Sequence, residues 1–493
     1  MPVLSTVLNP FEDSQAVFTS PHAEGFKPAG LPHPNPSKSF WIDSSPDANP
    51  LAREGSEGAL TSDADVCIIG SGMTGVSAAY ALSKQTPGFK VVILEARNFC
   101  AGATGRNGGH LTPALVEGFT STQEKYGTEQ TLKSYALENY TATEIVKVIH
   151  EHGLEEVVDL VEGGHISLLI TEKEVEVAKA EIAAAERAGQ DLGGVTWIDV
   201  EEMEKTYGAS YPGIRIPAHN LWPLKFVTQL YHLASNNLNL TLHTRTPVNA
   251  VTPLSSSDGS NNRRWSLSTP RGAVACNYVL HATNAYASHL LPHLAGHAGI
   301  VPARGQVAAL RAAAPLEELT PVSWDGNEGF EYWFPRPVRG KEGSNSTSTA
   351  NPTHPLVIVG GGREAAAPTY ETGVEDDSVT NPSVSRVLRD FLPEVFPGKY
   401  EREREFEMEW TGIMGFTRLG VPFVSTKAST DAETYKGQYI SAGYTGHGMP
   451  KAYACAEAAA SMIAADIKNE TWKQPEWLPD RYLTWKRDGV TGL

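Results

Sequence analysis

The first strong hydrophobic pattern in the chain begins at residue 64, after a polar and proline-rich stretch. The segment ADVCIIG, residues 64–70, is a short apolar run with β-branched side chains, which is typical of a strand buried on both faces. Small residues at 74–83 predict a helix, and the run KVVILE at 90–95 predicts a second buried strand. Their order and spacing predict a β–α–β unit of about 30 residues, which belongs to an α/β fold.

Farther along the chain, the hydrophobic periodicity predicts helices mixed with short strands. Helices are predicted at 134–152, 172–188, 224–235 and 450–467. Strands are predicted at 164–170, 240–243, 264–268, 278–282 and 438–442. Polar, low-complexity stretches predict surface loops at 255–263 and 340–355.

The first 50 residues hold nine prolines, far above an average of about 5%. Proline fixes φ and removes a backbone donor, so no long helix or strand is expected there. Residues 1–37 are interpreted as an N-terminal arm, either a flexible tail or an extended segment docked on the body. The aromatic side chains of Phe40 and Trp41 favour docking from Ser37 onward.

The composition narrows the class of protein. Of 493 residues, 41% are hydrophobic and 20% are charged, which indicates a large core. A formal net charge of −17 disfavours nucleic acid or an anionic membrane surface as the main partner. The four cysteines are far apart, which disfavours a disulfide scaffold or a zinc site, and no metal is expected. Without a secretory signal or an apolar run of about 18 residues, we expect a soluble, cytoplasmic protein.

The turn after the first strand has the sequence GSGMTG, residues 70–75, which matches G-x-G-x-x-G. The pattern alone is weak, but here it follows a buried strand and opens a helix, as a dinucleotide site requires. Gly70 permits the tight turn, Gly72 lets the backbone approach a pyrophosphate, and Gly75 lets the helix pack close to the strand. The N–H groups and the dipole of the helix N-terminus favour phosphate binding.

Glu95 ends the second strand, 20 positions after Gly75. A carboxylate there can accept hydrogen bonds from an adenosine ribose, so it favours a dinucleotide site over a chance glycine-rich turn. A second glycine-rich segment, GATGRNGGH at 102–110, follows at once. Glycines allow a loop to follow a flat ligand closely, and a second such loop favours FAD over the shorter reach of NAD.

In this order, GSGMTG, EAR and GATGRNGGH resemble the D-amino-acid-oxidase-type FAD-dependent oxidoreductases, and most of all their gamma-glutamylputrescine oxidoreductase branch. Later segments agree in family order, among them SFW, VLHATNAY, YWFPR, GGGR, WTG and GYTGHGM. The resemblance runs from about residue 37 to about residue 465. It implies FAD as the cofactor.

The resemblance also implies the division of the chain: a Rossmann-like FAD-binding domain and an α+β substrate domain whose mixed sheet covers the flavin. The FAD-binding domain would comprise 38–130, 222–300 and 405–467. The substrate domain would comprise 131–221 and 301–404, and 468–493 would form a C-terminal tail.

The resemblance further implies a set of cofactor-binding residues. Backbone donors from Thr104 to His110 would face the ring, with Arg106 or Asn107 near the pyrophosphate or the ring edge. The segment before the last helix would use that helix's dipole to stabilise negative charge on the reduced flavin. The implied residues are Gly70, Ser71, Gly72, Met73, Thr74, Gly75, Glu95, Ala96, Arg97, Thr104, Gly105, Arg106, Asn107, Gly108, Gly109, His110, Val248, Thr283, Gly412, Gly446, His447, Gly448 and Met449.

The candidates for catalytic contact with the substrate are His110, Tyr332, Arg336 and His447. Alternation along a strand places Tyr332 and Trp333 on opposite faces. Arg336 and Arg363 can each pair with a substrate carboxylate or form a structural salt bridge. His110 either lines the substrate cavity or is a structural histidine.

Two departures from sarcosine-oxidase relatives bear on the chemistry. No cysteine occurs between Cys276 and Cys455, where those relatives attach their flavin, so non-covalent FAD is expected. No lysine occurs between Lys225 and Lys341, although those relatives use a lysine near the flavin for reaction with oxygen. Oxygen and another electron acceptor therefore both stay open.

The function implied by the resemblance is FAD-dependent oxidation of a C–N bond in a small-molecule amine or amino acid. The substrate would bind as a neutral amine and transfer a hydride to flavin N5, which gives an imine that water hydrolyses. Two alternatives stay open: FAD-dependent oxidation of a C–OH donor such as a hydroxy acid, and a non-catalytic flavin-binding accessory protein.

Overall fold

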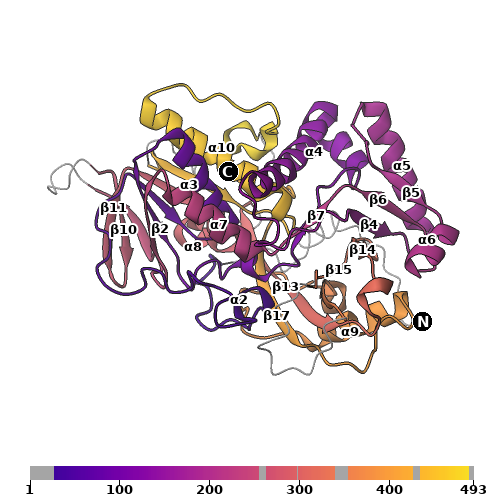
Figure 1. Cartoon of the computed structure of the whole chain (residues 1–493). Helices are drawn as coiled ribbons and strands as arrows, with labels where there is room; N and C mark the ends of the chain where they lie inside the picture. The colour runs from indigo at the N-terminus through magenta and orange to yellow at the C-terminus, as the bar shows by residue number, and fades with distance from the viewer. Residues whose placement is uncertain (1–26, 255–262, 297, 339–353, 426–433, 488–493) are drawn as a thin grey trace.

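The structure is a computed structural model that describes residues 27–254, 263–296, 298–338, 354–425 and 434–487. Two large sheets form its frame, one in the left half of Figure 1 and one in the right half. The predicted surface loops lie almost entirely outside the described residues, and so does most of the predicted N-terminal arm.

The first sheet has six strands in the order β18-β19-β12-β1-β2-β8, and all are parallel except the edge strand β18. The predicted β–α–β unit is confirmed, because helix α3 (Met73–Gln85) connects β1 to β2. The strands are β1 (Val66–Ile69), β2 (Lys90–Leu94), β8 (Asn239–His243), β12 (Tyr278–His281), β18 (Phe423–Ser425) and β19 (Gln438–Ala442).

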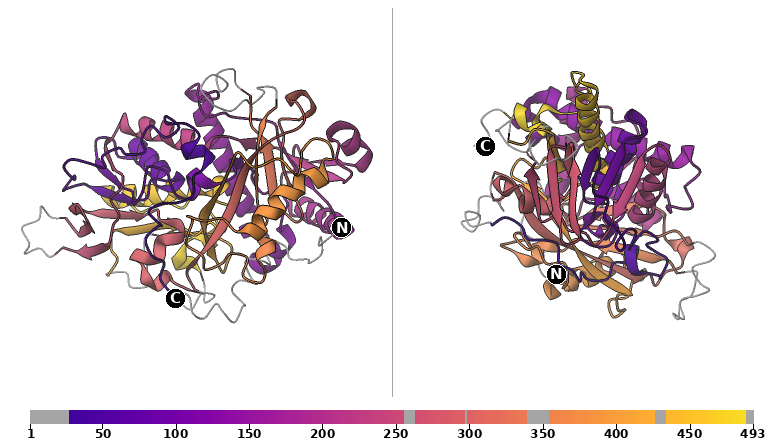
Figure 2. Two further views of the ribbon diagram at one scale, coloured as in Figure 1. Left: turned by 90° about the horizontal axis from the view of Figure 1, so that it is seen from below. Right: turned by 90° about the vertical axis from the view of Figure 1, so that its left-hand side faces the viewer.

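Both faces of this sheet are covered, which explains why its strands read as continuous apolar runs. Val66 and Ile68 of β1 point into the core shared with the helices, whereas Cys67 and Ile69 point into a second core under a small antiparallel sheet. The right-hand view of Figure 2 shows these layers from the side. The covering elements are α7 (Pro223–Ser235), α10 (Met449–Lys468), β9 (Ala250–Pro253), β10 (Trp265–Thr269) and β11 (Gly272–Cys276).

The second sheet has eight strands in the order β17-β13-β16-β15-β14-β4-β6-β5. It is mixed, as expected, because β14 and β4 pair in parallel while its other neighbours are antiparallel. The strands are β4 (His165–Leu168), β5 (Thr196–Ile198), β6 (Gly213–Ile216), β13 (Ile300–Arg311), β14 (Ser323–Gly326), β15 (Glu331–Pro335), β16 (Leu356–Gly360) and β17 (Met408–Thr417).

Strand β15 separates its side chains as alternation predicts. Trp333 packs in the core beneath helices α6 (Val200–Tyr207) and α9 (Pro382–Val395), stacked against Trp324 at 5.9 Å between ring centroids. Tyr332 lies on the opposite face of the second sheet, which faces the first sheet across a cavity. The outer core therefore fixes which side chains the second sheet presents inward.

Two observed elements differ from the sequence predictions, and a third agrees with them. Strand β17, for which no strand was predicted, pairs with β13 from Ile300↔Thr417 to Ala309↔Met408 in the second sheet. Helix α4 (Phe119–Glu151) begins well before residue 134, because the helix continues through a kink at Gly127, where φ is 78°. Helix α5 (Glu172–Ala188) has the predicted bounds and starts with a Thr171 capping box.

Both ends of the described chain are docked. The arm is held from Ala29, earlier than predicted, since Ala29 N donates to Ser288 Oγ at 2.9 Å. Trp41, in the short helix α2 (Phe40–Asp43), is almost fully buried, as the aromatic pair predicted. The C-terminal segment is packed rather than free, because Leu478 and Tyr482 are buried against the core that contains α10.

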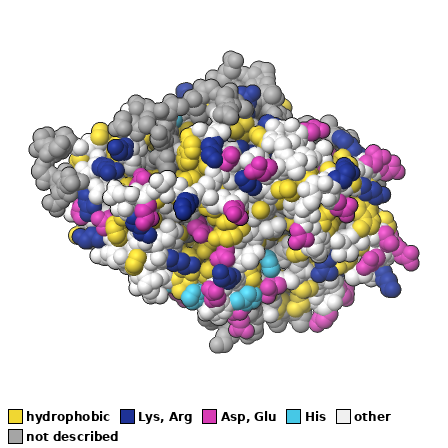
Figure 3. All heavy atoms as spheres, turned by 90° about the horizontal axis from the view of Figure 1, so that it is seen from above, with side chains coloured by type: hydrophobic (Ala, Val, Ile, Leu, Met, Phe, Trp, Pro, Cys, Tyr) yellow, Lys and Arg dark blue, Asp and Glu magenta, His cyan; other side chains and the backbone are white. Residues whose placement is uncertain are grey.

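The outer surface carries both signs of charge. Figure 3 shows Lys and Arg side chains interspersed with Asp and Glu over one face. Among the described residues, no helix combines the length and apolar character needed to cross a lipid bilayer.

A buried ion cluster joins the two halves. Arg97, in the loop after β2, donates from Nη1 to both carboxylate oxygens of Asp377 at 2.9 Å. The two side chains are only 6% and 1% exposed. Arg106 Nε lies 3.7 Å from Asp377 Oδ2, and the backbone N–H of Ser37 donates to the Asp377 carbonyl. One residue therefore holds the arm, the loop after β2 and the segment before α9 together.

Replacing Asp377 by alanine should destabilise the fold strongly, because two guanidinium groups would stay buried without their counter-charge. The expected loss is about 3–5 kcal/mol, seen as a lower urea midpoint of unfolding. The matched control is Glu57→Ala, which removes an exposed ion pair with Arg53 whose side chains are 81% and 59% accessible, and should change stability by less than about 1 kcal/mol. Equal effects of the two variants would contradict the proposed role of the cluster.

Candidate active site

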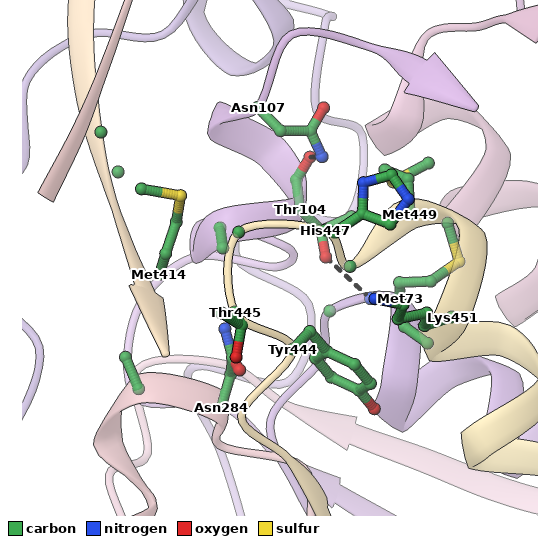
Figure 4. A pocket seen from close by; sticks show the side chains of 18 of the residues that line it. Met73, Thr104, Asn107, Asn284, Met414, Tyr444, Thr445, His447, Met449 and Lys451 are labelled. Atoms are coloured by element: carbon green, nitrogen blue, oxygen red, sulfur yellow. Dashed lines mark hydrogen bonds between the residues drawn. The ribbon is translucent and has the colours of Figure 1, made fainter. Parts of the chain in front are cut away.

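A large cavity lies between the two sheets and encloses about 540 Å³. Its wall is formed by the first glycine turn, the loop after β2, the start of α10 and the inward face of the second sheet. Figure 4 shows part of it, where Thr104, Tyr444 and His447 lie around a common space. Four predicted site residues are absent from its described wall: Gly75, Gly105, Gly109 and Arg336.

The turn between β1 and α3 leaves bare backbone at the wall. Gly70 has φ of 108°, and a Cβ there would lie 2.6 Å from the Ala282 carbonyl oxygen. A Cβ on Gly75 would lie 1.9 Å from the Gly70 oxygen, so this glycine packs the helix against the turn instead of facing the cavity. Met73 N donates to Thr104 Oγ1 at 3.0 Å, the dashed line in Figure 4, which joins the first glycine turn to the second glycine-rich loop.

Glu95 is held at the cavity wall by three donors. Its Oε2 accepts from Ser71 N at 3.0 Å and from Ser71 Oγ at 2.8 Å. Its Oε1 accepts from Arg97 N at 2.9 Å. Because a carboxylate offers about four lone-pair sites, Glu95 can still accept a hydrogen bond from a ligand's hydroxyl group. The side chain is 8% exposed, and this exposed part faces the cavity.

Arg106 borders the cavity, but its guanidinium is bound by backbone carbonyl groups. Its nitrogens donate to the carbonyl oxygens of Ser37, Thr411 and Ala101 at 2.7, 2.8 and 3.0 Å. Burial lowers the pKa of Arg106 to about 10, against the opposing effect of Asp377, so the group keeps its charge at neutral pH. Arg106 thus ties the loop to the arm and to β17.

The neighbours of Arg106 divide between packing and the cavity. Thr104, Asn107 and Gly108 line the cavity wall. Gly105 and Gly109 pack away from it, since a Cβ on Gly105 would lie 2.3 Å from the Cys100 oxygen and one on Gly109 would lie 2.8 Å from the Leu221 oxygen.

The segment before α10 brings a charged group of three side chains to the wall. His447 Nε2 lies 2.9 Å from Glu138 Oε2, and Lys451 Nζ lies 3.3 Å from Glu138 Oε1. Ala114 N also donates to Glu138 Oε2 at 2.7 Å. Burial alone would raise the pKa of Glu138, but Lys451, His447 and the Ala114 N–H outweigh it and lower that pKa to about 2. Glu138 and Lys451 carry no sequence motif, so sequence reasoning missed them.

Strand β3 (His110–Leu111) and the inward face of the second sheet contribute uncharged polar groups. His110 lines the cavity with its ring centroid 5.4 Å from that of Tyr332, and its nitrogens lie 3.1 and 3.3 Å from the Gly108 and Trp333 oxygens. Burial lowers the pKa of His110 to about 4 and raises the pKa of Tyr332 to about 12. Both side chains are therefore neutral across the physiological range.

The two arginines that could bind a carboxylate separate in the structure. Arg336 lies outside the cavity wall, where its Nη2 donates to Asp159 at 2.8 Å and its guanidinium packs 4.6 Å from the Phe40 ring centroid. Its role is the structural salt bridge. Arg363 lines the cavity, where it donates to the Tyr370 carbonyl at 3.3 Å and lies 5.0 Å from the Phe416 ring centroid.

The N-terminal arm supplies a part of the wall that sequence reasoning missed. Gly30, Leu31 and Pro32 border the cavity. Gly30 N donates to Glu375 Oε2 at 2.9 Å, and Arg97 Nη1 donates to the His33 oxygen at 3.2 Å. Leu31 is held between these anchors with 41% of its surface exposed. A proline-rich arm has no pattern that marks it as part of a binding site.

Comparison with known proteins identifies the family of this chain. A family model described as FAD dependent oxidoreductase matches residues 65–462. A probable oxidoreductase OrdL from Rhizobium meliloti is 25% identical over 408 residues, which cover 80% of this chain and 81% of the relative. The gamma-glutamylputrescine oxidoreductase of Escherichia coli is 43% identical over 63 residues, 13% of this chain and 14% of that protein.

The fold also matches solved structures. A glycine oxidase from Geobacillus kaustophilus superposes with a TM-score of 0.59 at 19% identity, over 83% of this chain and 96% of that one. This likeness establishes the fold class predicted from the sequence, with a dinucleotide-type sheet and a second, mixed sheet.

Removing the Leu31 side chain should weaken binding of FAD about tenfold, because the apolar surface that it presents to the cavity would be lost. The dissociation constant can be measured by titrating apoprotein with FAD and following the quenching of flavin fluorescence. Leu316→Ala is the matched control, since Leu316 is 37% exposed and lies outside the cavity wall. An unchanged dissociation constant for Leu31→Ala would show that the arm does not contact the cofactor.

Proposed function

Since the chain belongs to the FAD dependent oxidoreductase family, we propose that it oxidises a C–N bond of an amine or an amino acid, with FAD bound non-covalently. The observation that carries this proposal is the cavity between the two sheets, which has a backbone cradle at the glycine turn and uncharged polar groups around Tyr332. The names of a gamma-glutamylputrescine oxidoreductase and a glycine oxidase among similar proteins support an amine or an amino acid as substrate.

The residues of the cavity fit FAD. The glycine turn places backbone N–H groups and the N-terminus of α3 where a pyrophosphate can be bound, and a Cβ on Gly72 would lie 3.0 Å from Thr104 Oγ1 and narrow this cradle. Glu95 keeps acceptor capacity for the ribose hydroxyl groups. Gly412, Gly446 and Gly448 line the wall beyond, where the ring system would need a close approach of backbone.

All four cysteines support non-covalent attachment. Cys67, Cys100, Cys276 and Cys455 are buried, and none of them borders the cavity along its described wall. Burial raises the pKa of Cys100, the one nearest in sequence to the glycine-rich loop, so its thiol is protonated and poorly nucleophilic.

When bound, FAD supplies the hydride acceptor for the α-carbon of the substrate. The chain's own contribution at one side of the ring is positive potential, because the N-terminus of α10 opens at Gly448 and Lys451 lies in its first turn. Glu138 balances Lys451 and His447, which keeps the local charge close to neutral until negative charge develops on the ligand.

At the substrate side, the neutral forms of His110 and Tyr332 suit a deprotonated amine. The positive charge of Arg363 acts on Tyr332, where it opposes the rise in the pKa of the tyrosine. The same charge disfavours a protonated amine beside Tyr332. The amine nitrogen then keeps its lone pair, which assists loss of the hydride from the adjacent carbon. The resulting imine is hydrolysed by water, and this route requires no carboxylate base beside the α-carbon.

The purified protein should carry FAD that is released completely by denaturation. Under anaerobic conditions, amines or amino acids should bleach the flavin absorption band, whereas the matched hydroxy acids should not, because the neutral cavity end selects a nitrogen lone pair. Stopped-flow absorption measures the rate of bleaching for each pair. Bleaching by hydroxy acids alone would favour oxidation of a C–OH donor, and a flavin that no donor bleaches would favour an accessory protein.

A further inference from the structure

The side chain of Glu117 lines the cavity at a point where the backbone is fixed. Residues 112–118 connect strand β3 (His110–Leu111) to helix α4. Tyr135 Oη donates to the Glu117 carbonyl at 2.7 Å, and Gly118 adopts φ of 68° at the N-cap of α4. Because the backbone is held on both sides of Glu117, this residue keeps its place in the cavity wall.

The surroundings of Glu117 are water-accessible but enclosed by protein. Its side chain is exposed to solvent in the cavity. Burial within the molecule nevertheless raises the pKa of Glu117, and the negative charges of Asp325 and Glu138 add to this effect against His447 and His165. Such a combination is expected for a carboxylate on the inner wall of a deep cavity.

The neighbouring carboxylates already have partners. Glu138 is bound by His447, Lys451 and the Ala114 N–H. Asp325 Oδ2 lies 3.0 Å from His165 Nε2. For Glu117, by contrast, the described ranges of the chain contain no side chain that forms an ion pair with it. A carboxylate on a cavity wall without such a partner can accept charge-assisted hydrogen bonds from a cationic group of a ligand.

We propose that Glu117 binds a second, non-reacting ammonium group of the substrate, so that the enzyme acts on diamines or on amino acids with a basic side chain. This inference rests on the proposed oxidation of a C–N bond and specifies the class of substrate. The second ammonium group keeps its protons and its bonds throughout, and only the other nitrogen's carbon is oxidised.

The distribution of charge along the cavity supports this assignment. The end near Tyr332 and Arg363 disfavours a cation, so a nitrogen there binds as a neutral amine. Glu117 adds to the cavity wall a carboxylate without an ion-pair partner among the described residues, and this point favours a cation. A substrate with two amino groups would therefore bind in one orientation, with the ammonium at Glu117 and the reacting carbon at the neutral end.

The test compares cadaverine with hexylamine, in which a methyl group replaces one ammonium group, and lysine with norleucine, which lacks the terminal ammonium group. The dissociation constants are measured on the FAD-loaded enzyme from changes in the flavin absorption spectrum under anaerobic conditions. The wild-type protein should bind the diammonium compounds about tenfold to a hundredfold more tightly, the range of one charge-assisted hydrogen bond.

Glu117→Gln should abolish this preference and leave the dissociation constants of hexylamine and norleucine unchanged within about twofold. Glu117→Asp, which keeps the charge, should retain part of it. Glu176→Gln is the matched control, since it removes one negative charge from the outer face of α5 and should leave the preference intact. The preference should also grow as the pH rises through the raised pKa of Glu117, because the side chain then gains its negative charge. The other titratable groups that act on Glu117 are Asp325, Glu138, His165 and His447.

Three outcomes separate this inference from the proposed function. A preference that survives Glu117→Gln would overturn the inference, and so would a wild-type protein that binds both members of each pair equally. If hexylamine bleaches the flavin without any preference for cadaverine, the oxidation of amines stands and the inference fails. If the preference depends on Glu117 but no amine bleaches the flavin, the proposed oxidation of amines fails instead.

Discussion

The carboxylate of Asp377 is the point on which the cavity's geometry depends. It is fully buried, and it binds Arg97 from the loop after β2 while Arg106 lies within 3.7 Å. These arginines in turn bind the carbonyl oxygens of His33, Ser37 and Thr411. Arm, glycine-rich loop and second sheet are therefore fixed relative to one another by charge-assisted bonds in a dry environment, where such bonds hold geometry well.

Elements whose signal is local could be predicted from the sequence, and those defined by long-range pairing could not. Strand β1, helix α3 and strand β2 follow from apolar runs around a glycine turn, and α5 from its helix-forming composition. Strand β17 was not predicted, because its partner β13 is separated from it by about 100 residues and nothing local specifies that pairing.

The same division applies to the site. Glycines near a nucleotide leave a readable pattern, because close backbone approach excludes every other residue. An arginine leaves none, since its long side chain can reach a ligand or a buried carboxylate equally well. Arg336 could have bound a substrate carboxylate or formed a salt bridge, and it pairs with Asp159. Arg106 borders the cavity, but backbone carbonyl groups bind its guanidinium. Glu138 and Glu117 belong to no motif, and only the fold brings them to the cavity.

The cavity also shows why charge must be counted with its partners rather than by residue type. Glu138 and Glu117 line the same cavity, but Lys451 and His447 lower the pKa of Glu138 to about 2 while the pKa of Glu117 is raised. The first carboxylate is part of the protein's own balance of charge. The second has no ion-pair partner among the described residues, so a cationic group of a ligand can neutralise it and be selected by its charge.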